Sequence, residues 1–157
     1  MKRTPLYERH IDLGARMIDF GGWDMPVQYA GVIEEHRTTR KAAGLFDICH
    51  MGEIDVIGPS AFELLQLVIS RNLEGQKIGQ MKLSVITNEK GGIIDDLTVY
   101  RLAEEYYRLV TNASRTDIDY RWVLKIKEEK GINDVQVIDA TDETGKVDRV
   151  VSGLKLV

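Results

Sequence analysis

The chain has 157 residues, of which 43% are hydrophobic and 29% are charged, a composition typical of one soluble globular domain with its own core. Its formal net charge of −4 weighs against nucleic acid or an anionic membrane as the main partner, because both attract basic surfaces. No apolar run approaches the roughly 18 residues of a membrane helix, and the start "MKRTPLYERH" lacks the apolar stretch of a secretory signal, so we predict a cytoplasmic protein.

The first fifty residues predict two helices joined by a loop. The segment "LYERHIDLGAR" is typical of a short helix that ends at Gly14, a residue suited to a left-handed cap. The stretch 19–29, "DFGGWDMPVQY", combines paired glycines, a proline and large aromatic residues, and it predicts a structured loop. Residues 32–43 predict a second helix that ends before Gly44.

Strands and helices alternate in the middle of the chain. Residues 52–59, "GEIDVIGP", alternate and stop at a Gly-Pro pair, as a strand does. The stretch "SAFE" (60–63) matches a capping box, in which the serine and glutamate side chains satisfy backbone donors at the start of a helix. Residues 81–87 and 93–101 predict two strands around "NEKGG", a hairpin-type turn.

The last third of the chain predicts a strand, a helix and another strand. Residues 106–112, "YYRLVTN", predict the first of these strands, and "SRTD" (114–117) opens a helix by a similar cap that ends at Gly131. Residues 134–140, "DVQVIDA", predict the last strand. The remaining residues, 141–157, predict a polar loop followed by one more short element.

These elements predict an α+β fold. The strand pairs joined by tight turns must run antiparallel, so we expect an antiparallel sheet with helices packed on one side. The sequence has no internal repeat and no low-complexity linker, and residues 1–157 are therefore expected to form one compact unit.

Two adjacent carboxylates, Asp95 and Asp96, lie inside a predicted strand in "GGIIDDLTVYR". Neighbouring residues of a strand point to opposite faces, so Asp95 shares a face with Leu97 and Val99, and Asp96 shares the other with Thr98 and Tyr100. A carboxylate in partly apolar surroundings must be hydrogen-bonded, paired or protonated, and such groups are concentrated at functional sites. The alternative is a structural aspartate that accepts hydrogen bonds from the local backbone.

The face that carries Asp96 suits a flat ligand. Arg108, Val110 and Asn112 on the following strand line up beside Thr98 and Tyr100 if the register allows it. A carboxylate, a phenol, an amide and apolar side chains together would suit a heteroaromatic ligand with amide-like edges.

Four long blocks of the sequence resemble one known family. They resemble the N-terminal half of the aminomethyltransferase of the glycine cleavage system, the T-protein, over residues 4 to about 122. The blocks are "TPLYERHIDLGARMIDFGGWDMPVQY", "EEHRTTRKAAGLFDICHMGEIDVIGP", "NEKGGIIDDLTVYRL" and "LVTNAS".

The resemblance implies half of a folate-binding fold and transfer of an aminomethyl group to tetrahydrofolate. In the family, the lipoyl arm of the H-protein carries that group, and the products are methylenetetrahydrofolate and ammonia. The position matching Asp96 is the family's key acidic residue, which makes Asp95 structural. The positions expected to line the folate pocket match Met51, Leu83, Asp96, Tyr100, Val110 and Asn112. Leu83 stands where some relatives carry tyrosine.

Members of the family are more than twice as long, and their second half supplies further contacts to the folate. The resemblance therefore leaves two functions open: a transferase that works as a homodimer or with a second chain, and a non-catalytic module for binding folate or a protein. A homodimer would imitate the two similar halves of the family fold. No matched motif names a basic residue for the acidic glutamate tail of folate.

Other functional sites are disfavoured. Cys49 is the only cysteine, so the chain has no intramolecular disulfide, and the adjacent His50 points away from Cys49 on an extended backbone. The three histidines lack a chelating spacing, and no metal site is expected. Tyr106 and Tyr107 could suggest an RNA-binding sheet, but the acidic charge opposes it. We predict that Trp23 packs within a loop and does not anchor a protein interface.

Overall fold

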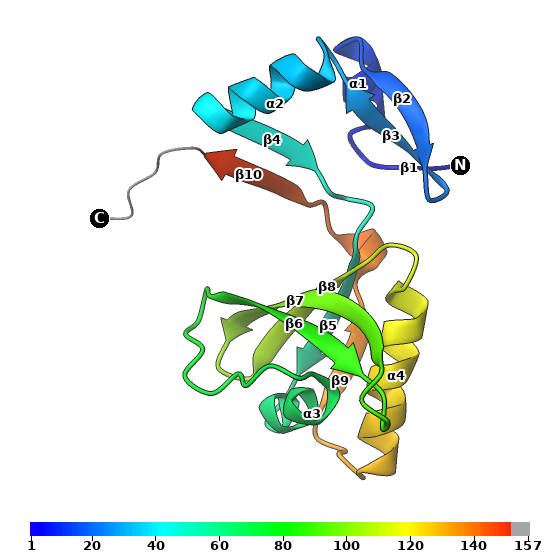
Figure 1. The fold of residues 1–157 in the computed structure, drawn as a ribbon. Helices are drawn as coiled ribbons and strands as arrows, with labels where there is room; N and C mark the ends of the chain where they lie inside the picture. The colour runs from blue at the N-terminus through cyan, green and yellow to red at the C-terminus, as the bar shows by residue number, and fades with distance from the viewer. Residues whose placement is uncertain (152–157) are drawn as a thin grey trace. The chain divides into compact units, whose positions relative to one another are not determined.

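The computed structural model describes residues 1–151, which divide into two compact units (Figure 1). The N-terminal unit comprises residues 1–50 together with 144–151, and the sheet unit comprises Met51–Glu143. The sequence predicts one compact unit, whereas contacts within the described chain form two. A long-range pairing adds residues 144–151 to the N-terminal unit, because a strand near the end of the described chain returns to residues 43–47.

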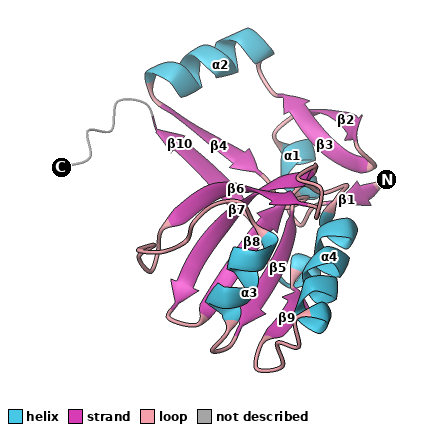
Figure 2. Cartoon of the chain, turned by 60° about the horizontal axis from the view of Figure 1, so that its bottom comes forward, coloured by secondary structure: helices cyan, strands magenta, loops and turns pink. Residues whose placement is uncertain are grey.

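The sheet unit contains a five-stranded antiparallel sheet in the order β6-β7-β8-β5-β9 (Figure 2). Its strands are β5 (Gly52–Ile57), β6 (Met81–Thr87), β7 (Ile93–Ala103), β8 (Tyr106–Thr111) and β9 (Gln136–Asp139). Two helices, α3 (Ala61–Val68) and α4 (Thr116–Glu129), cover one face of the sheet. The predicted α+β class, with helices on one side of an antiparallel sheet, is confirmed.

The core of the sheet unit lies between this face and the two helices. Alternate strand residues such as Val56, Val99 and Leu109 point into it and are fully buried. On α3, Leu64 and Leu65 face the same core. Burial of an aliphatic side chain of this size contributes about 1.5–3 kcal/mol, so this layer is the main source of stability in the unit.

Both helix caps predicted from the sequence are wrong. The Ser60 hydroxyl donates to the Asp134 carboxylate at 2.9 Å, and no side chain caps α3. The α4 helix begins after Arg115 without a side-chain cap, and the Thr116 hydroxyl donates to the Asn112 carbonyl oxygen at 3.2 Å. A capping box is a local pattern, and here a contact across 74 residues takes the serine instead.

The N-terminal unit is built from short elements. They are β1 (Lys2–Arg3), α1 (Tyr7–Asp12), β2 (Arg16–Phe20), β3 (Trp23–Gln28), α2 (Val32–Lys41), β4 (Ala43–Asp47) and β10 (Val147–Val151). Strands β1, β3 and β2 form one sheet, and β10 pairs antiparallel with β4 to form another. Both helices predicted in this region are present.

The predicted loop over 19–29 is wrong, because these residues belong largely to a β2–β3 hairpin. Phe20 pairs with Trp23, and the two-residue turn between them is Gly21-Gly22, both with positive φ. Such a turn matches the right-handed twist of the flanking strands and favours glycine at both positions. The Asp19 carboxylate accepts a hydrogen bond from the Gly22 N–H at 2.8 Å and closes the turn.

The predicted polar loop after residue 140 is also partly wrong. Residues Thr141–Glu143 form a 3₁₀ turn and Val147–Val151 form β10. The last predicted element, over 150–157, lies outside the described residues except for its first two, which belong to β10. Among residues 1–151, no helix is both long enough and apolar enough to cross a bilayer.

Candidate functional site

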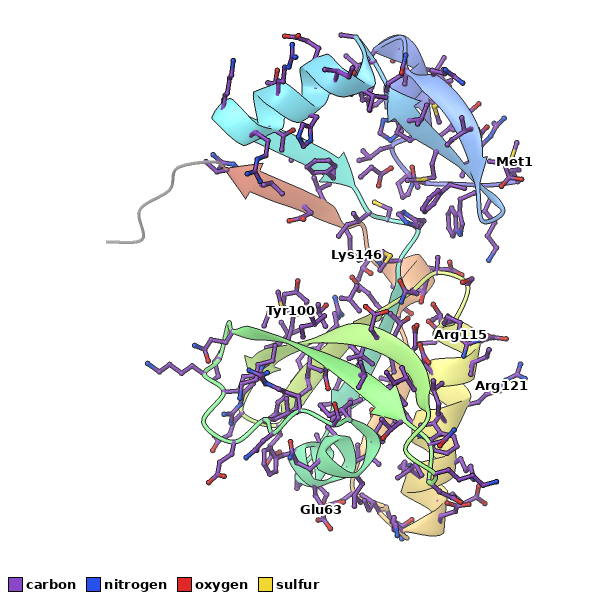
Figure 3. The ribbon with its side chains drawn as sticks, in the orientation of Figure 1. Met1, Glu63, Tyr100, Arg115, Arg121 and Lys146 are labelled. Carbon is purple, nitrogen blue, oxygen red and sulfur yellow. The ribbon has the colours of Figure 1, made fainter. Side chains whose placement is uncertain are left out.

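The candidate site is the face of the five-stranded sheet that the helices do not cover, called here the open face. The register of the strands places Thr98 between Leu83 of β6 and Val110 of β8. Tyr100 lies in the next row between Met81 and Arg108, on the side of the sheet away from α3 (Figure 3). The open face therefore carries the line of side chains that strand alternation predicts.

All six residues expected to bind folate belong to the sheet unit and lie on or beside the open face. Leu83, Tyr100 and Val110 occupy it through the register just described. Asp96 pairs with Val85, and Asn112 follows directly after β8. Met51 directly precedes β5, whose first residue pairs with the last residue of β8. The structure thus brings the six together in one place.

The two adjacent aspartates have opposite environments. Asp95 is 8% exposed and points to the helix side, with Leu97 and Val99, whereas Asp96 is exposed on the open face. The Asn112 amide nitrogen donates to Asp95 Oδ1 at 2.9 Å and also contacts Asp96 Oδ1 at 3.2 Å. One amide therefore connects the buried carboxylate with the exposed one.

Asp119 of α4 is a residue that the sequence analysis does not single out. It is fully buried, and within residues 1–151 neither of its carboxyl oxygens has a hydrogen-bond partner. Burial above all, together with the influence of Asp95, raises the pKa of Asp119 to about 8, while Arg115 acts in the opposite direction. Asp119 is therefore protonated near neutral pH.

The signal for Asp119 is present in the sequence. Asp119, Val123 and Ile126 recur at the spacing of one helix face, and all three are buried. An acidic residue in an apolar stripe predicts a protonated or paired group.

A second cluster of polar side chains on the open face surrounds Arg108. Its guanidinium group binds the Asp55 carboxylate in a bidentate manner, at 2.6 and 2.8 Å, and contacts Glu53 at 2.9 Å. The Tyr106 hydroxyl donates to Asp55 at 2.8 Å. Glu53 and Asp55 are 3% and 6% exposed, and the hydrogen bond with Asp55, together with the nearby carboxylates, raises the pKa of Arg108. Arg108 is thus committed to two buried carboxylates and is not available to hold the acidic tail of a ligand.

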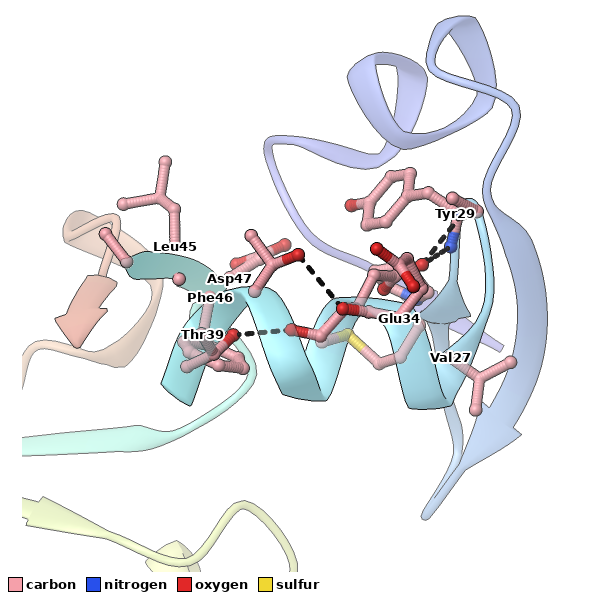
Figure 4. A pocket seen from close by; sticks show the side chains of 14 residues that line it. Val27, Tyr29, Glu34, Thr39, Leu45, Phe46 and Asp47 are labelled. Atoms are coloured by element: carbon pink, nitrogen blue, oxygen red, sulfur yellow. Dashed lines mark hydrogen bonds between the residues drawn. The ribbon is translucent and has the colours of Figure 1, made fainter. Parts of the chain in front are cut away.

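The N-terminal unit holds a pocket of about 370 Å³ between β3, α2 and β4 (Figure 4). Beside it, His10 lies between the Tyr29 hydroxyl at 2.7 Å and the Asp47 carboxylate at 2.9 Å, and the Thr4 hydroxyl donates to the same carboxylate at 2.6 Å. Burial alone would raise the pKa of Asp47, but hydrogen bonds from Cys49, His10 and Thr4 lower it. Every member of this network has a partner, so we interpret it as structural.

The Cys49 thiol is not suited to nucleophilic chemistry. It is buried, donates to the Lys146 carbonyl oxygen at 3.2 Å and accepts from the Lys146 N–H at 3.1 Å. Burial raises its pKa, whereas a nucleophilic thiol needs a lowered one. His50 contacts the rings of Phe20 and Trp23 instead.

Comparisons with known proteins agree on one family. Residues 6–149 match the sequence family described as the GCVT N-terminal domain. An aminomethyltransferase of Symbiobacterium thermophilum is 48% identical over 143 residues, which cover 91% of this chain and 38% of that protein.

A solved structure is similar as well. The crystal structure of the glycine cleavage system aminomethyltransferase T from Bartonella henselae matches with a TM-score of 0.80 and 43% identity. The match covers 88% of this chain and 38% of that one. The chain therefore spans less than half the length of the relatives it matches.

Proposed function

The chain belongs to the GCVT N-terminal domain family, and from this premise we propose that its open face forms one side of a tetrahydrofolate site for aminomethyl transfer in glycine cleavage. The observation that carries the proposal is the placement of Asp96. It is the exposed member of the aspartate pair, and the other candidate ligand-binding residues lie around it on the same sheet.

The residues present fit a reduced pterin. The pterin ring is flat, with polar N–H and carbonyl edges, and a sheet face offers it a flat surface. Leu83 and Val110 provide apolar contact, while Asp96, Tyr100 and Asn112 provide a carboxylate, a phenol and an amide. This mixture of a few placed polar groups among apolar ones is typical of a small-molecule site.

Bound tetrahydrofolate would supply the nitrogen atoms that receive the one-carbon unit. Asp96, being exposed, can reach such a nitrogen, accept its proton as the carbon–nitrogen bond forms, and stabilise the positive charge that develops. Asn112 holds the Asp96 carboxylate in place through its amide hydrogens. Tyr100, on the same face two rows from Asp96, orients the ligand at its other edge.

The proposal extends to the surroundings of the site. We propose that the chain corresponds to the N-terminal half of the folate-binding domain, that the donor is a lipoyl carrier of the H-protein type, and that the protein acts in the cytoplasm. The chain spans 38% of the relatives it matches, and a homodimer that completes the pocket belongs to this proposal. The alternative is a folate- or protein-binding module without turnover.

A calorimetric titration of the full chain with a stable reduced folate tests the proposal. Binding by the parent that is weakened in Asp96→Asn and retained in Asp117→Asn would support it, because Asp117 is an exposed carboxylate on α4. No binding by the parent would refute an independent folate site. Tetrahydrofolate-dependent release of ammonia from an aminomethyl-loaded carrier separates the transferase from the module, and size-exclusion chromatography with light scattering tests the homodimer.

A further inference from the structure

Helix α2 of the N-terminal unit is only lightly packed. None of its residues is buried, and the hydrophobic core of the described chain consists of residues of the sheet unit alone. The half-buried residues of α2 are Glu35 and Thr39, which line the pocket between the helix and β4. A helix this short depends on packing for its stability, so the rest of its surface is free to be covered by a partner.

The side of α2 away from this pocket carries a row of cations. At about 100° per residue, Ile33, Arg37, Arg40 and Lys41 fall within one arc of the helix, roughly opposite Thr39. All four side chains are exposed, Ile33 to 68%. We call these four residues the outer face of α2.

The cations of the outer face have no acidic partner. Within residues 1–151, none of its three basic side chains forms an ion pair. Helix α4 is different, because Arg121 pairs with Asp117 at 3.0 Å and Lys125 pairs with Glu129 at 3.5 Å, each one turn away on the same helix. The exposed cations of α4 are thus neutralised locally, and those of α2 are not.

The two acidic residues of α2 are directed elsewhere. The Glu35 carboxylate accepts hydrogen bonds from the backbone N–H groups of Tyr29, Ala30 and Gly31 at 2.7, 2.7 and 2.9 Å. These bonds lower its pKa and hold it at the start of the helix. Glu34 lines the pocket beside β4 (Figure 4). The positive charge of the outer face therefore remains available to a partner.

The helix dipole explains only part of this pattern. Basic side chains in the last turn of a helix interact favourably with its C-terminal carbonyl groups, and this accounts for Arg40 and Lys41. Arg37 lies one turn earlier, where the dipole has little effect. Ile33, in the first turn, gains nothing from exposure to water. A row that extends from an apolar residue to three cations is typical of a surface that binds another molecule.

We propose that the outer face of α2 is a docking surface for a separate polypeptide rich in carboxylates, which pair with Arg37, Arg40 and Lys41 while an apolar side chain covers Ile33. The three cations lie within about 6 Å along the helix axis. An acidic segment with two or three carboxylates on one helical face matches this spacing, and the two guanidinium groups can bind them in a bidentate manner. The inference goes beyond the folate site and does not depend on it.

Charge and shape favour an acidic protein over other partners. Nucleic acids bind extended basic surfaces, whereas this row is short and the whole chain has a net charge of −4. An amphipathic helix that binds a membrane needs a broad apolar face, and here Ile33 is the apolar residue of the row. A second copy that offered a different surface to α2 would form an open-ended contact rather than a closed dimer.

The test titrates a fluorescein-labelled helical peptide of glutamate, leucine and alanine, with its carboxylates on one face, with the full chain and follows fluorescence anisotropy. We expect saturable binding that weakens about tenfold in the double variant Arg37→Glu/Arg40→Glu and falls steeply as salt is added. Lys90→Glu/Lys130→Glu is the matched control, because it makes the same change of charge at exposed residues of the sheet unit and should bind within about twofold of the parent. Ile33→Ser should weaken binding about threefold through the lost apolar contact.

Several results would overturn the inference. They are an absence of peptide binding by the parent, equal binding of a peptide with glutamine in place of glutamate, and parent-like binding by Arg37→Glu/Arg40→Glu when circular dichroism shows that this variant is folded. Tighter binding of single-stranded RNA or of phosphatidylserine vesicles than of the peptide would assign the surface to that class of partner. Self-association of the parent that is lost in the same double variant would assign it to a second copy. A folate titration is unaffected by any of these outcomes, so the two proposals fail separately.

Discussion

Replacement of Asp119 by asparagine should stabilise the chain at neutral pH, by an amount that grows with pH. The carboxyl group has an ordinary pKa of 3.8 when unfolded and a pKa of about 8 in the fully buried position. Between these values the folded state holds one proton more than the unfolded state. The free energy of unfolding therefore falls by about 1.4 kcal/mol for each pH unit gained, or about 4 kcal/mol between pH 4 and pH 7.

Asparagine cannot ionise, so Asp119→Asn removes this loss. Such a gain is a large fraction of the 5–15 kcal/mol that is typical of a whole domain. The informative window is pH 5–8, because it lies between the pKa of 3.8 for the unfolded carboxyl group and the pKa of about 8 for the folded one.

The assay is urea unfolding followed by Trp122 fluorescence in a Trp23→Phe background. The two tryptophans lie in different units, and Trp122 packs against the core that contains Asp119's helix. The difference in unfolding free energy between Asp119→Asn and the parent should widen by about 1.4 kcal/mol per pH unit. Two parallel pH profiles, or a variant less stable than the parent at pH 8, would refute the raised pKa of Asp119.

Three further substitutions test the packing around the site, each by urea unfolding of the sheet unit. Arg108→Met should cost about 3–5 kcal/mol, because it leaves two buried carboxylates without their guanidinium partner; a cost under 1 kcal/mol would show that they are hydrated. Gly52→Ala should destabilise the unit, since a Cβ there would overlap the side chains of both Thr116 and Thr111, and a parent-like midpoint would contradict this. Leu109→Ala, at a fully buried position, should cost about 2–5 kcal/mol, whereas Leu45→Ala, 73% exposed in the other unit, should leave the Trp122 transition unchanged.

Local patterns predict the parts of this fold that depend on neighbouring residues. The β6–β7 hairpin follows from two alternating segments around a glycine-containing turn, and alternation alone assigns Asp95 and Asp96 to opposite faces. The β2–β3 hairpin also forms between neighbouring residues. The strand after its Gly21-Gly22 turn contains a proline, however, and this favours the prediction of a loop.

Contacts between distant residues explain what the sequence does not predict. Strand β10 exists because it pairs with β4, about a hundred residues earlier, and its own five residues are too few to predict a strand. The Ser60 hydroxyl leaves its expected cap for Asp134. The resemblance to a family names the six residues of the open face but gives no indication of the carboxyl group beneath them.

The adjacency of Asp95 and Asp96 is informative because the pleat of the sheet separates their surroundings. Asp96 can serve as an ionised acceptor only if the carboxyl groups behind it do not add much negative charge, since like charges at short range favour protonation. The proton on Asp119 keeps that buried group neutral near pH 7, and the Asn112 amide nitrogen donates to both Asp95 and Asp96. A neutral residue at position 95 would remove the charge but also release Asn112. The two aspartates therefore have different roles. Asp95 fixes the Asn112 amide, and Asp96 remains exposed to a ligand beside it.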